Sequence, residues 1–128
     1  MIHHVSIGVR DIAAARRFYD AALKPLGVKC LSEDTSSLGY GGTEGPRLWL
    51  LASGAAVPRD IPGLHICLEA ERRSEVDSFH AAAIRNGGRD NGKPGLRADY
   101  GENYYAAFVI DPDGNRLEAY CGADENSR

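Results

Sequence analysis

The stretch His4-Val5-Ser6-Ile7-Gly8-Val9 decides the fold, because its pattern returns at His65, 61 residues later. In each copy an apolar strand with period two begins near the histidine and leads into a helix. The offset still applies at the end of the helix, where Gly27 corresponds to Gly88. Because the match extends from the strand through the helix to its end, each half of the chain is one structural module.

The first module is predicted to contain one helix and four strands. Alternation along residues 4–9 places the two valines and the isoleucine toward the helix, and His4 on the opposite face. Asp11 precedes apolar residues at helical spacing, which predicts an N-cap and a helix over residues 12–23. Three further strands are predicted over residues 28–32, 37–40 and 47–52.

The second module follows a predicted linker over residues 53–62 and repeats this plan. Its predicted elements are a strand over 64–70, a helix over 74–86 capped by Ser74, and strands over 104–110 and 116–121. The last two strands form a hairpin around Asp111-Pro112-Asp113-Gly114-Asn115, where proline and glycine favour a turn. Residues 91–103, rich in Gly, Arg and Tyr, are expected to arch over a site rather than add a strand.

The predicted fold class is α+β, with two βαβββ modules that form a curved mixed sheet and carry their helices on its convex side. Residues 1–128 are expected to be a single domain. Its modules span residues 1–54 and 60–122, and a short polar tail over 123–128 is expected to fray.

Composition excludes several classes of partner. The net charge of −3 arises from acids and bases mixed along the chain, without the basic block that binds a nucleic-acid backbone. No apolar run approaches the ~20 residues that span a bilayer, and no basic-then-apolar leader is present, so a cytoplasmic protein is expected. The three cysteines lack CxxC spacing and are expected to be reduced and mostly buried.

Three potential metal ligands lie on the strand faces that point away from the helices. They are His4, His65 and Glu118. A single histidine in a strand is more often a hydrogen-bonded, half-buried side chain, but equivalent positions in two repeats favour a ligand role. Two imidazoles and a carboxylate suit Fe²⁺, Mn²⁺, Ni²⁺, Zn²⁺ or Co²⁺, and three protein ligands leave positions open for substrate. The pattern predicts one catalytic divalent metal ion.

The sequence resembles the vicinal oxygen chelate superfamily, which includes glyoxalase I, extradiol dioxygenases, fosfomycin-resistance proteins and bleomycin-resistance proteins. The resemblance spans nearly the whole chain and rests on three segments: residues 4–11 with Phe18-Tyr19, residues 65–68, and residues 111–118. In metal-binding members, the residues that match His4, His65 and Glu118 are the ligands. The resemblance implies substrate chelation through vicinal oxygens.

Trp49 departs from the glyoxalase I pattern. Aligning residues 47–49 with residues 116–118 puts Trp49 at the position of a fourth ligand, which is usually Glu in glyoxalase I. Because Trp cannot bind the metal, the resemblance implies a three-ligand site of the dioxygenase or fosfomycin-resistance kind. Trp49 is expected to pack in a core or subunit interface, or to form a wall of the substrate pocket.

Other residues are candidates for contacts with a substrate. Arg97 and Tyr100 belong to the insert, and Cys67 and Tyr120 share the strand face of Glu118. Glu118 with Tyr104 or Tyr105 is the candidate catalytic group, although alternation lets only one of these two tyrosines face the site. Taken singly, each of these tyrosines is more typical of a packing residue of the hairpin, and Arg97 of a solvated side chain. The other two histidines, His3 and His80, are expected to be exposed and on a helix surface, respectively.

The leading functional hypothesis is a metal-dependent enzyme, a lyase/isomerase or an extradiol dioxygenase, acting on a small molecule through vicinal oxygens. The alternative is a non-catalytic small-molecule-binding protein of the bleomycin-resistance type, with an aromatic groove. A metal-free module that only forms dimers is a third hypothesis. By resemblance the protein is expected to be a homodimer, and its metal site either lies within one chain or takes its ligands from both.

Overall fold

The repeated sequence pattern corresponds to two modules in a computed structural model, which describes residues 1–53 and 63–124. Module 1 consists of β1 (Val5–Val9), α1 (Ile12–Leu23), the short 3₁₀ helix η1 (Lys24–Leu26), β2 (Lys29–Glu33), β3 (Ser37–Gly42) and β4 (Gly45–Ala52). Module 2 consists of β5 (Ile66–Glu69), α2 (Arg73–Arg85), β6 (Arg89–Leu96), β7 (Tyr105–Ile110) and β8 (Arg116–Cys121). Apart from Ser53 and residues 123–124, the expected linker and tail lie outside the described residues.

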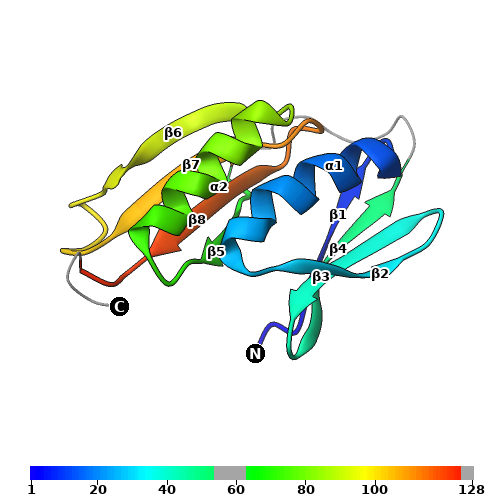
Figure 1. Ribbon diagram of the computed structural model, residues 1–128, viewed down its shortest axis with the longest axis horizontal. Helices are drawn as coiled ribbons and strands as arrows, with labels where there is room; N and C mark the ends of the chain where they lie inside the picture. The colour runs from blue at the N-terminus through cyan, green and yellow to red at the C-terminus, as the bar shows by residue number, and fades with distance from the viewer. Residues whose placement is uncertain (54–62, 125–128) are drawn as a thin grey trace.

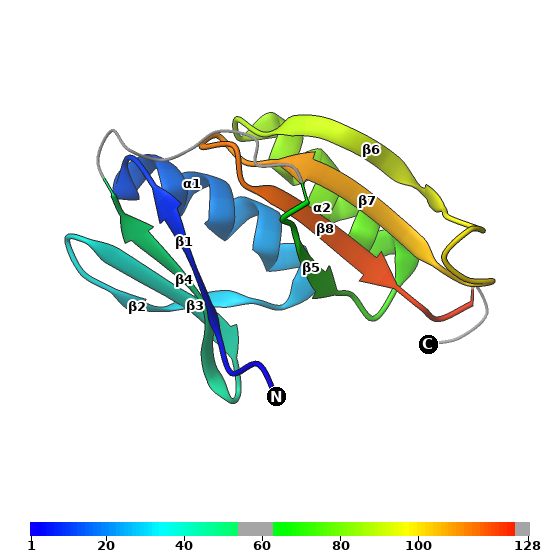
Figure 2. The same cartoon turned by 180° about the vertical axis from the view of Figure 1, so that it is seen from behind.

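Each module has its own mixed four-stranded sheet, with strand orders β1-β4-β3-β2 and β5-β8-β7-β6. The first strand of each module pairs in parallel with the last, and the other pairs are antiparallel. The α+β class and the two βαβββ modules are confirmed. The described hydrogen bonds form two sheets rather than the single curved sheet that was expected. The helices cover one side of the sheets, and the other side is free of helices (Figure 1, Figure 2). We call these uncovered sides the open faces.

The start of α1 follows the sequence prediction. The Oδ1 atom of Asp11 accepts hydrogen bonds from the backbone nitrogens of Ala13 and Ala14, at 2.9 and 3.3 Å. These bonds satisfy donors that would otherwise lack partners at the first turn. Among the described residues, neither helix is long and apolar enough to cross a bilayer.

The predicted cap of α2 is wrong, because the helix begins one residue earlier, at Arg73. The backbone nitrogens of Glu71 and Arg72 donate to the Glu75 carboxylate, at 2.9 and 3.3 Å. A carboxylate in the first turn therefore satisfies the free donors, and a serine cap is not needed.

Residues 89–96 correct a second prediction, because they form strand β6 rather than a loop. This strand pairs antiparallel with β7, and its register shifts twice around Gly92. The strand lies at the edge of its sheet, where Pro94 and the glycines interrupt few ladder bonds. The glycines and the proline therefore made this edge strand resemble a loop in the sequence. The repeat requires it, because β6 is the equivalent of β2 in module 1.

The core lies between the sheets and the two helices. Leu48, Leu50 and Leu117 are buried in this core, and Phe18 and Phe79 occupy equivalent buried positions in the two modules. All three cysteines are free. Only one of them is buried, since Cys121 is buried, Cys30 is half-buried and Cys67 is exposed. The expectation of mostly buried cysteines is therefore wrong.

The predicted turn over residues 111–115 joins the two modules. Asp111 is buried and accepts hydrogen bonds from the Tyr19 hydroxyl of α1 and from Asn115. The Asn115 amide also donates to the Gly8 carbonyl of β1 at 3.1 Å, and Arg10 donates to Asp113 at 2.9 Å. A turn of module 2 is thus hydrogen-bonded to the end of β1 and to the residue that follows it.

Candidate functional site

The buried carboxylate of Glu118 is the centre of the open face of module 2. Its residue is only 3% exposed. The Nε2 atom of His65 lies 3.0 Å from Oε1, and the Tyr104 hydroxyl donates to Oε2 at 2.6 Å. The His65 side chain is itself half exposed. Glu118 is therefore a buried carboxylate that contacts His65 and Tyr104 beneath an accessible face.

The strand register explains why these groups meet. Cys67 of β5 and Phe108 of β7 are the direct neighbours of Glu118 on either side of β8. His65 immediately precedes β5, and its ring lies 6.3 Å from the Phe108 ring on this face. Sequence reasoning did not select Phe108, although counting by twos from Tyr104 places it on this face.

Burial and the charge of Glu118 keep the phenol of Tyr104 and the thiol of Cys67 protonated. Desolvation, followed by the hydrogen bond to Glu118, raises the pKa of Tyr104 above its ordinary value. Desolvation by surrounding groups and the charge of Glu118 raise the pKa of the Cys67 thiol to about 12, although the residue retains exposed surface. Tyr104 is therefore a proton donor at neutral pH, and Cys67 is not an activated nucleophile.

Tyr104 and Tyr105 point in different directions, as alternation required. The Tyr105 hydroxyl donates to Asp77 of α2 at 2.6 Å, and the guanidinium carbon of Arg73 lies 5.2 Å from its ring centroid. Tyr105 thus belongs to the helix side. Of the two candidate catalytic tyrosines, only Tyr104 contacts Glu118.

Two predicted substrate contacts, Tyr100 and Tyr120, pack against Tyr104. The Tyr104 ring centroid lies 4.2 Å from that of Tyr120 and 5.3 Å from that of Tyr100. Tyr100 is 67% exposed. These three tyrosines, which we call the aromatic cluster, extend the open face of module 2 from Glu118 toward solvent.

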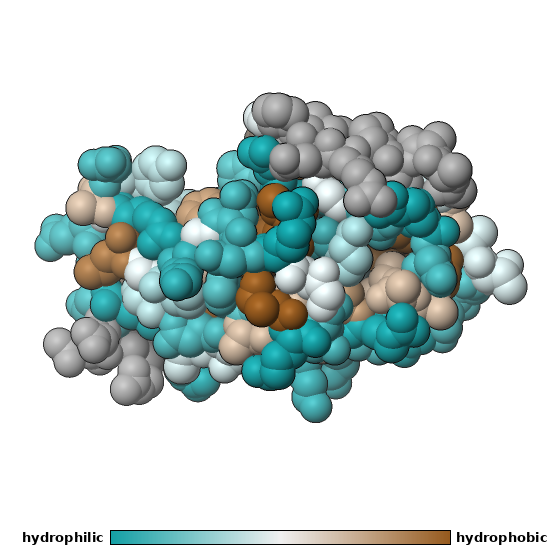
Figure 3. Space-filling model, turned by 90° about the horizontal axis from the view of Figure 1, so that it is seen from above, coloured by the Kyte–Doolittle hydropathy of each residue, from teal (hydrophilic) through white to brown (hydrophobic). Residues whose placement is uncertain are grey.

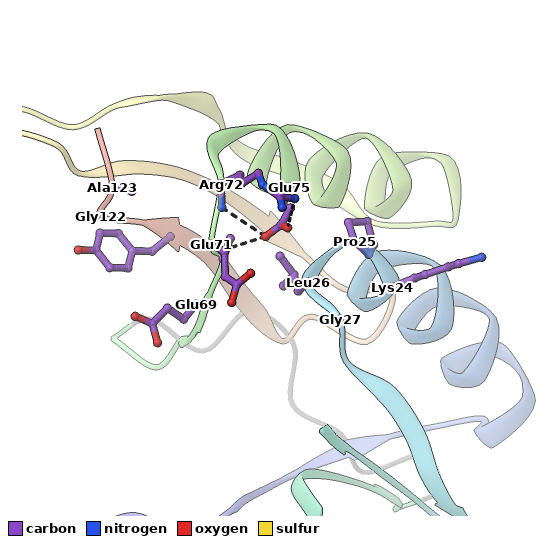
Figure 4. Close-up of a pocket in the computed structure, with 12 residues that line it drawn as sticks. Lys24, Pro25, Leu26, Gly27, Glu69, Glu71, Arg72, Glu75, Gly122 and Ala123 are labelled. Carbon is purple, nitrogen blue, oxygen red and sulfur yellow. Dashed lines mark hydrogen bonds and ion pairs between the residues drawn. The ribbon is translucent and has the colours of Figure 1, made fainter. Parts of the chain in front are cut away.

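A groove of about 990 Å³ continues from the aromatic cluster toward the end of the sheet. Tyr120 and Glu69 line it from module 2, and Lys24 to Gly27 line it from module 1. In Figure 4 the Glu75 carboxylate is bonded to Arg72 and to Glu71, whereas Glu69 extends from β5 without such a bond. The groove includes Tyr120 of the aromatic cluster among its lining residues, whereas Glu118 does not line it.

Arg97 packs against Phe108 of the same face, but its guanidinium is hydrogen-bonded to strand β6, which it follows. Its guanidinium nitrogens donate to the carbonyls of Gly95 and Lys93, at 3.0 and 2.7 Å. The guanidinium carbon lies 5.4 Å from the Phe108 ring centroid. Arg97 therefore packs on the aromatic side chain beside Glu118, rather than extending freely into solvent.

His4 does not join His65 and Glu118. It is exposed, and its Nδ1 atom lies 2.9 Å from that of His3. Among residues 1–53 and 63–124, no group of three or more His, Cys, Asp or Glu side chains is arranged to hold a metal ion. The predicted convergence of all three ligands is therefore absent from the described chain.

The relation between the modules explains this separation. Ile7, in the middle of β1, lines a small cavity with His65 and Ile66, whereas His4, just before β1, lines a groove with Cys67 and Leu68. The two strands thus run in opposite directions past each other (Figure 2). Equivalent positions, which the repeat suggested would meet, lie at opposite ends of the neighbouring strands.

Trp49 occupies the position in module 1 that Glu118 occupies in module 2. Trp49 is registered with Ser6, as Glu118 is with Cys67, and Ser6 and Cys67 are repeat-related. The half-buried indole covers Gly39, where an added Cβ would lie only 2.7 Å from a ring carbon. Module 1 therefore offers an aromatic surface where module 2 offers a carboxylate.

The remaining histidine, His80, is bound to the sheet of its own module. Its Nε2 atom lies 2.9 Å from Asp90 of β6, and its side chain is mostly covered. His80 lies on α2 as expected, but its side chain is covered rather than exposed on the helix surface, and the pair joins α2 to the edge strand.

Comparison with known proteins agrees with this architecture. Residues 1–119 match the Glyoxalase/Bleomycin resistance protein/Dioxygenase superfamily. The match covers most of the chain, and the chain belongs to this superfamily. The resemblance identified from the sequence is therefore confirmed at the level of family and fold.

Individual relatives share the whole module pair. A crystal structure of a glyoxalase/bleomycin resistance protein from Albidiferax ferrireducens is 32% identical, with a TM-score of 0.80, and the similarity covers 91% of this chain and 95% of that one. The uncharacterized protein YqjT of Bacillus subtilis is 28% identical over 91% of this chain and 95% of its own length. A glyoxalase-related enzyme from Fulvimarina pelagi, 18% identical, has the same fold with a TM-score of 0.74 over 100% and 96% of the two chains.

Proposed function

We propose that the protein is a metal-dependent enzyme that binds a small substrate through vicinal oxygens at His65 and Glu118. The single observation that carries the proposal is the contact between the His65 nitrogen and a Glu118 carboxylate that is 3% exposed. A carboxylate is rarely buried to this extent unless it is paired or binds a cation. Its position on the open face, rather than in the core, favours a role in binding.

The two side chains fit half of a metal site. Two donors about 2.1 Å from one ion, at about 90° to each other, are separated by about 3 Å. The 3.0 Å between His65 Nε2 and Glu118 Oε1 matches this spacing. Imidazole and carboxylate suit Fe²⁺, Mn²⁺, Co²⁺, Ni²⁺ and Zn²⁺. A bound ion of this kind would polarise the oxygens of a carbonyl, diol or catechol substrate.

Tyr104 supplies the proton chemistry in this proposal. Its hydroxyl donates to Glu118 at 2.6 Å and retains its proton at neutral pH. It is therefore placed to donate a proton to a substrate oxygen beside the carboxylate, as a general acid. The aromatic cluster excludes water from one side of the same position and provides flat apolar surface for a substrate.

The third ligand is proposed to be His4 of the partner subunit in a homodimer. Within one chain, His4 and His65 lie at opposite ends of β1 and β5, but His4 is exposed and free to approach a second copy. In a two-fold pair, the open face of module 1 on each chain can cover the open face of module 2 on the other. Such a contact is self-complementary, as a two-fold interface must be.

Binding of Co²⁺, followed by calorimetry and by its visible spectrum, tests the metal proposal. Glu118→Gln is expected to weaken binding by roughly 10–100-fold or more, because it removes a direct ligand. Glu69→Gln is the matched control, since Glu69 is an exposed carboxylate on the same sheet face. Equal affinity in the wild type and Glu118→Gln would refute the site. Oxygen uptake with catechols then separates dioxygenase from isomerase or lyase chemistry.

A non-catalytic binder of the bleomycin-resistance type is the second candidate. The aromatic cluster and the adjoining groove support it, because they offer ring surfaces that do not depend on a metal. If this alternative is correct, purified protein binds aromatic ligands with unchanged affinity after treatment with a chelator. Glu118→Gln then leaves ligand affinity intact, whereas Tyr120→Ala reduces it.

A further inference from the structure

The side chains of His3 and His4 face each other at the start of module 1. Their Nδ1 atoms are 2.9 Å apart, and their ring planes are inclined at 87° with centroids 5.1 Å apart. Alternation predicted that these neighbours would point in opposite directions. That rule does not apply here, because β1 begins only at Val5 and both histidines precede it.

The backbone at His3 is fixed by contacts with β4. Arg47 donates from its guanidinium to the His3 carbonyl at 3.0 Å, and a second nitrogen of Arg47 donates to Glu44 at 2.7 Å. This chain of contacts joins the segment before β1 to the strand beside it. The two imidazoles are therefore presented together on a supported segment.

The spacing of the two nitrogens suits a single metal ion. Two nitrogens about 2.05 Å from one ion and about 90° apart are separated by about 2.9 Å, the distance between the two Nδ1 atoms. In the absence of an ion, one imidazole donates its proton to the lone pair of the other at the same spacing. When both rings carry their proton on Nε2, both Nδ1 atoms have a free lone pair, and a small rotation of the rings directs these lone pairs at one cation.

We infer that His3 and His4 form a bidentate chelate that holds one divalent transition-metal ion through both Nδ1 atoms. Ions that accept ligands at 90°, such as Co²⁺, Ni²⁺, Mn²⁺ and Fe²⁺, fit this geometry better than tetrahedral Zn²⁺. Both rings are exposed, so each Nε2–H can donate to water while Nδ1 binds the ion.

The inference deepens the proposed function and rests on it in one respect, because the partner subunit's His65 and Glu118 would complete the coordination. The site would then have three histidines and one carboxylate. Trp49 occupies the position in module 1 that corresponds to Glu118 and cannot bind a metal ion. His3 would therefore supply the fourth donor atom. A groove beside the two histidines, also lined by Cys67 and Glu44, leaves space for the ion and its other ligands.

Titration of the full chain with Co²⁺ tests the inference, with the visible absorption bands of the ion as the readout. Co²⁺ is preferred to Cu²⁺, which can displace backbone amide protons and obscure the role of the imidazoles. His3→Ala and His4→Ala are each expected to weaken binding by roughly tenfold or more and to shift the bands. His80→Gln, which alters a histidine bound to Asp90, is the control and is expected to leave both unchanged.

The outcomes separate this inference from the proposed function. Loss of binding in His4→Ala and Glu118→Gln with full binding in His3→Ala would overturn the chelate and leave the proposed function standing. Loss in both histidine variants, with full binding in Glu118→Gln, would support the chelate and refute the proposed site. Loss in all three supports both, and a wild-type protein that binds no Co²⁺ overturns both.

Discussion

Glu118 shows how one buried charge changes the chemistry of its neighbours. Its carboxylate accepts from Tyr104 and lies 3.0 Å from His65, and it faces Cys67 across the strand pair. A negative charge at this position disfavours ionisation of the adjacent phenol and thiol. The site is therefore rich in potential ligands and proton donors, and it lacks an activated nucleophile.

The reactivity of Cys67 should depend on that charge. Its pKa of about 12 predicts slow alkylation by iodoacetamide at pH 8, because the thiolate fraction is small. Glu118→Gln removes a charge that raises this pKa, so the rate of alkylation at Cys67 should increase. Mass spectrometry of chelator-treated protein measures the rate at this cysteine.

Glu69 provides the comparison for this prediction. Its charge also raises the pKa of Cys67, but it is the smallest of the causes. Glu69→Gln should therefore accelerate alkylation less than Glu118→Gln. Equal rates in the wild type and Glu118→Gln would show that the carboxylate does not control the thiol.

The secondary-structure elements show where local sequence signals were sufficient. The cap at Asp11 and the apolar spacing after it predicted α1 with its observed bounds, Ile12–Leu23. Strand β6 was missed because its glycines and proline resemble a loop, and an edge strand tolerates them. The contact between the 111–115 turn and module 1 was not predictable either, because it depends on how the two modules pack.

The buried hydroxyl of Tyr19 should stabilise that contact. Tyr19→Phe removes a donor to the buried carboxylate of Asp111 and should lower the free energy of unfolding by about 1–3 kcal/mol. Urea denaturation measures the change. Tyr100→Phe, at a residue that is 67% exposed, should have little effect. An equal decrease in the free energy of unfolding in both variants would contradict a stabilising role for the Tyr19–Asp111 hydrogen bond.

The end of α2 depends on a close approach at Gly88. A Cβ at this position would lie 2.8 Å from a Phe18 ring carbon and 2.9 Å from the Ala83 carbonyl oxygen. Gly88→Ala should therefore destabilise the fold by about 1–3 kcal/mol through overpacking between the modules. Gly42→Ala, where a Cβ meets nothing within 4 Å, is the control in the same denaturation experiment. A Gly88→Ala protein as stable as the wild type would contradict the packing described.

At the scale of the molecule, the repeat has two consequences that sequence alone could not separate. It supplies equivalent histidines in both modules, and it also places β1 and β5 in opposite directions, so that His4 and His65 do not meet within a chain. Alternation correctly predicted that Cys67 and Glu118 share a face, but it failed for His3 and His4, whose rings contact each other. The distance between the residues along the strands was set by the packing of the modules.

One side of the molecule offers little apolar surface for contact with a second chain. The side of the molecule shown in Figure 3 is dominated by hydrophilic residues, with small and separate apolar areas. A dimer that covers the open faces would instead bring together Trp49 and the exposed Leu51 of one chain with the aromatic cluster of the other. Sedimentation should therefore give a dimer, and a monomer at micromolar concentration would contradict a shared site.

Complementation between two inactive variants tests the shared site most directly. His4→Ala retains His65 and Glu118, whereas Glu118→Gln retains His4, and neither variant alone should bind Co²⁺ with wild-type affinity. After the two are mixed and allowed to exchange subunits, each mixed dimer contains one intact site. High-affinity Co²⁺ binding should therefore reappear in the mixture, and failure to recover it in confirmed mixed dimers would contradict a site built from two chains.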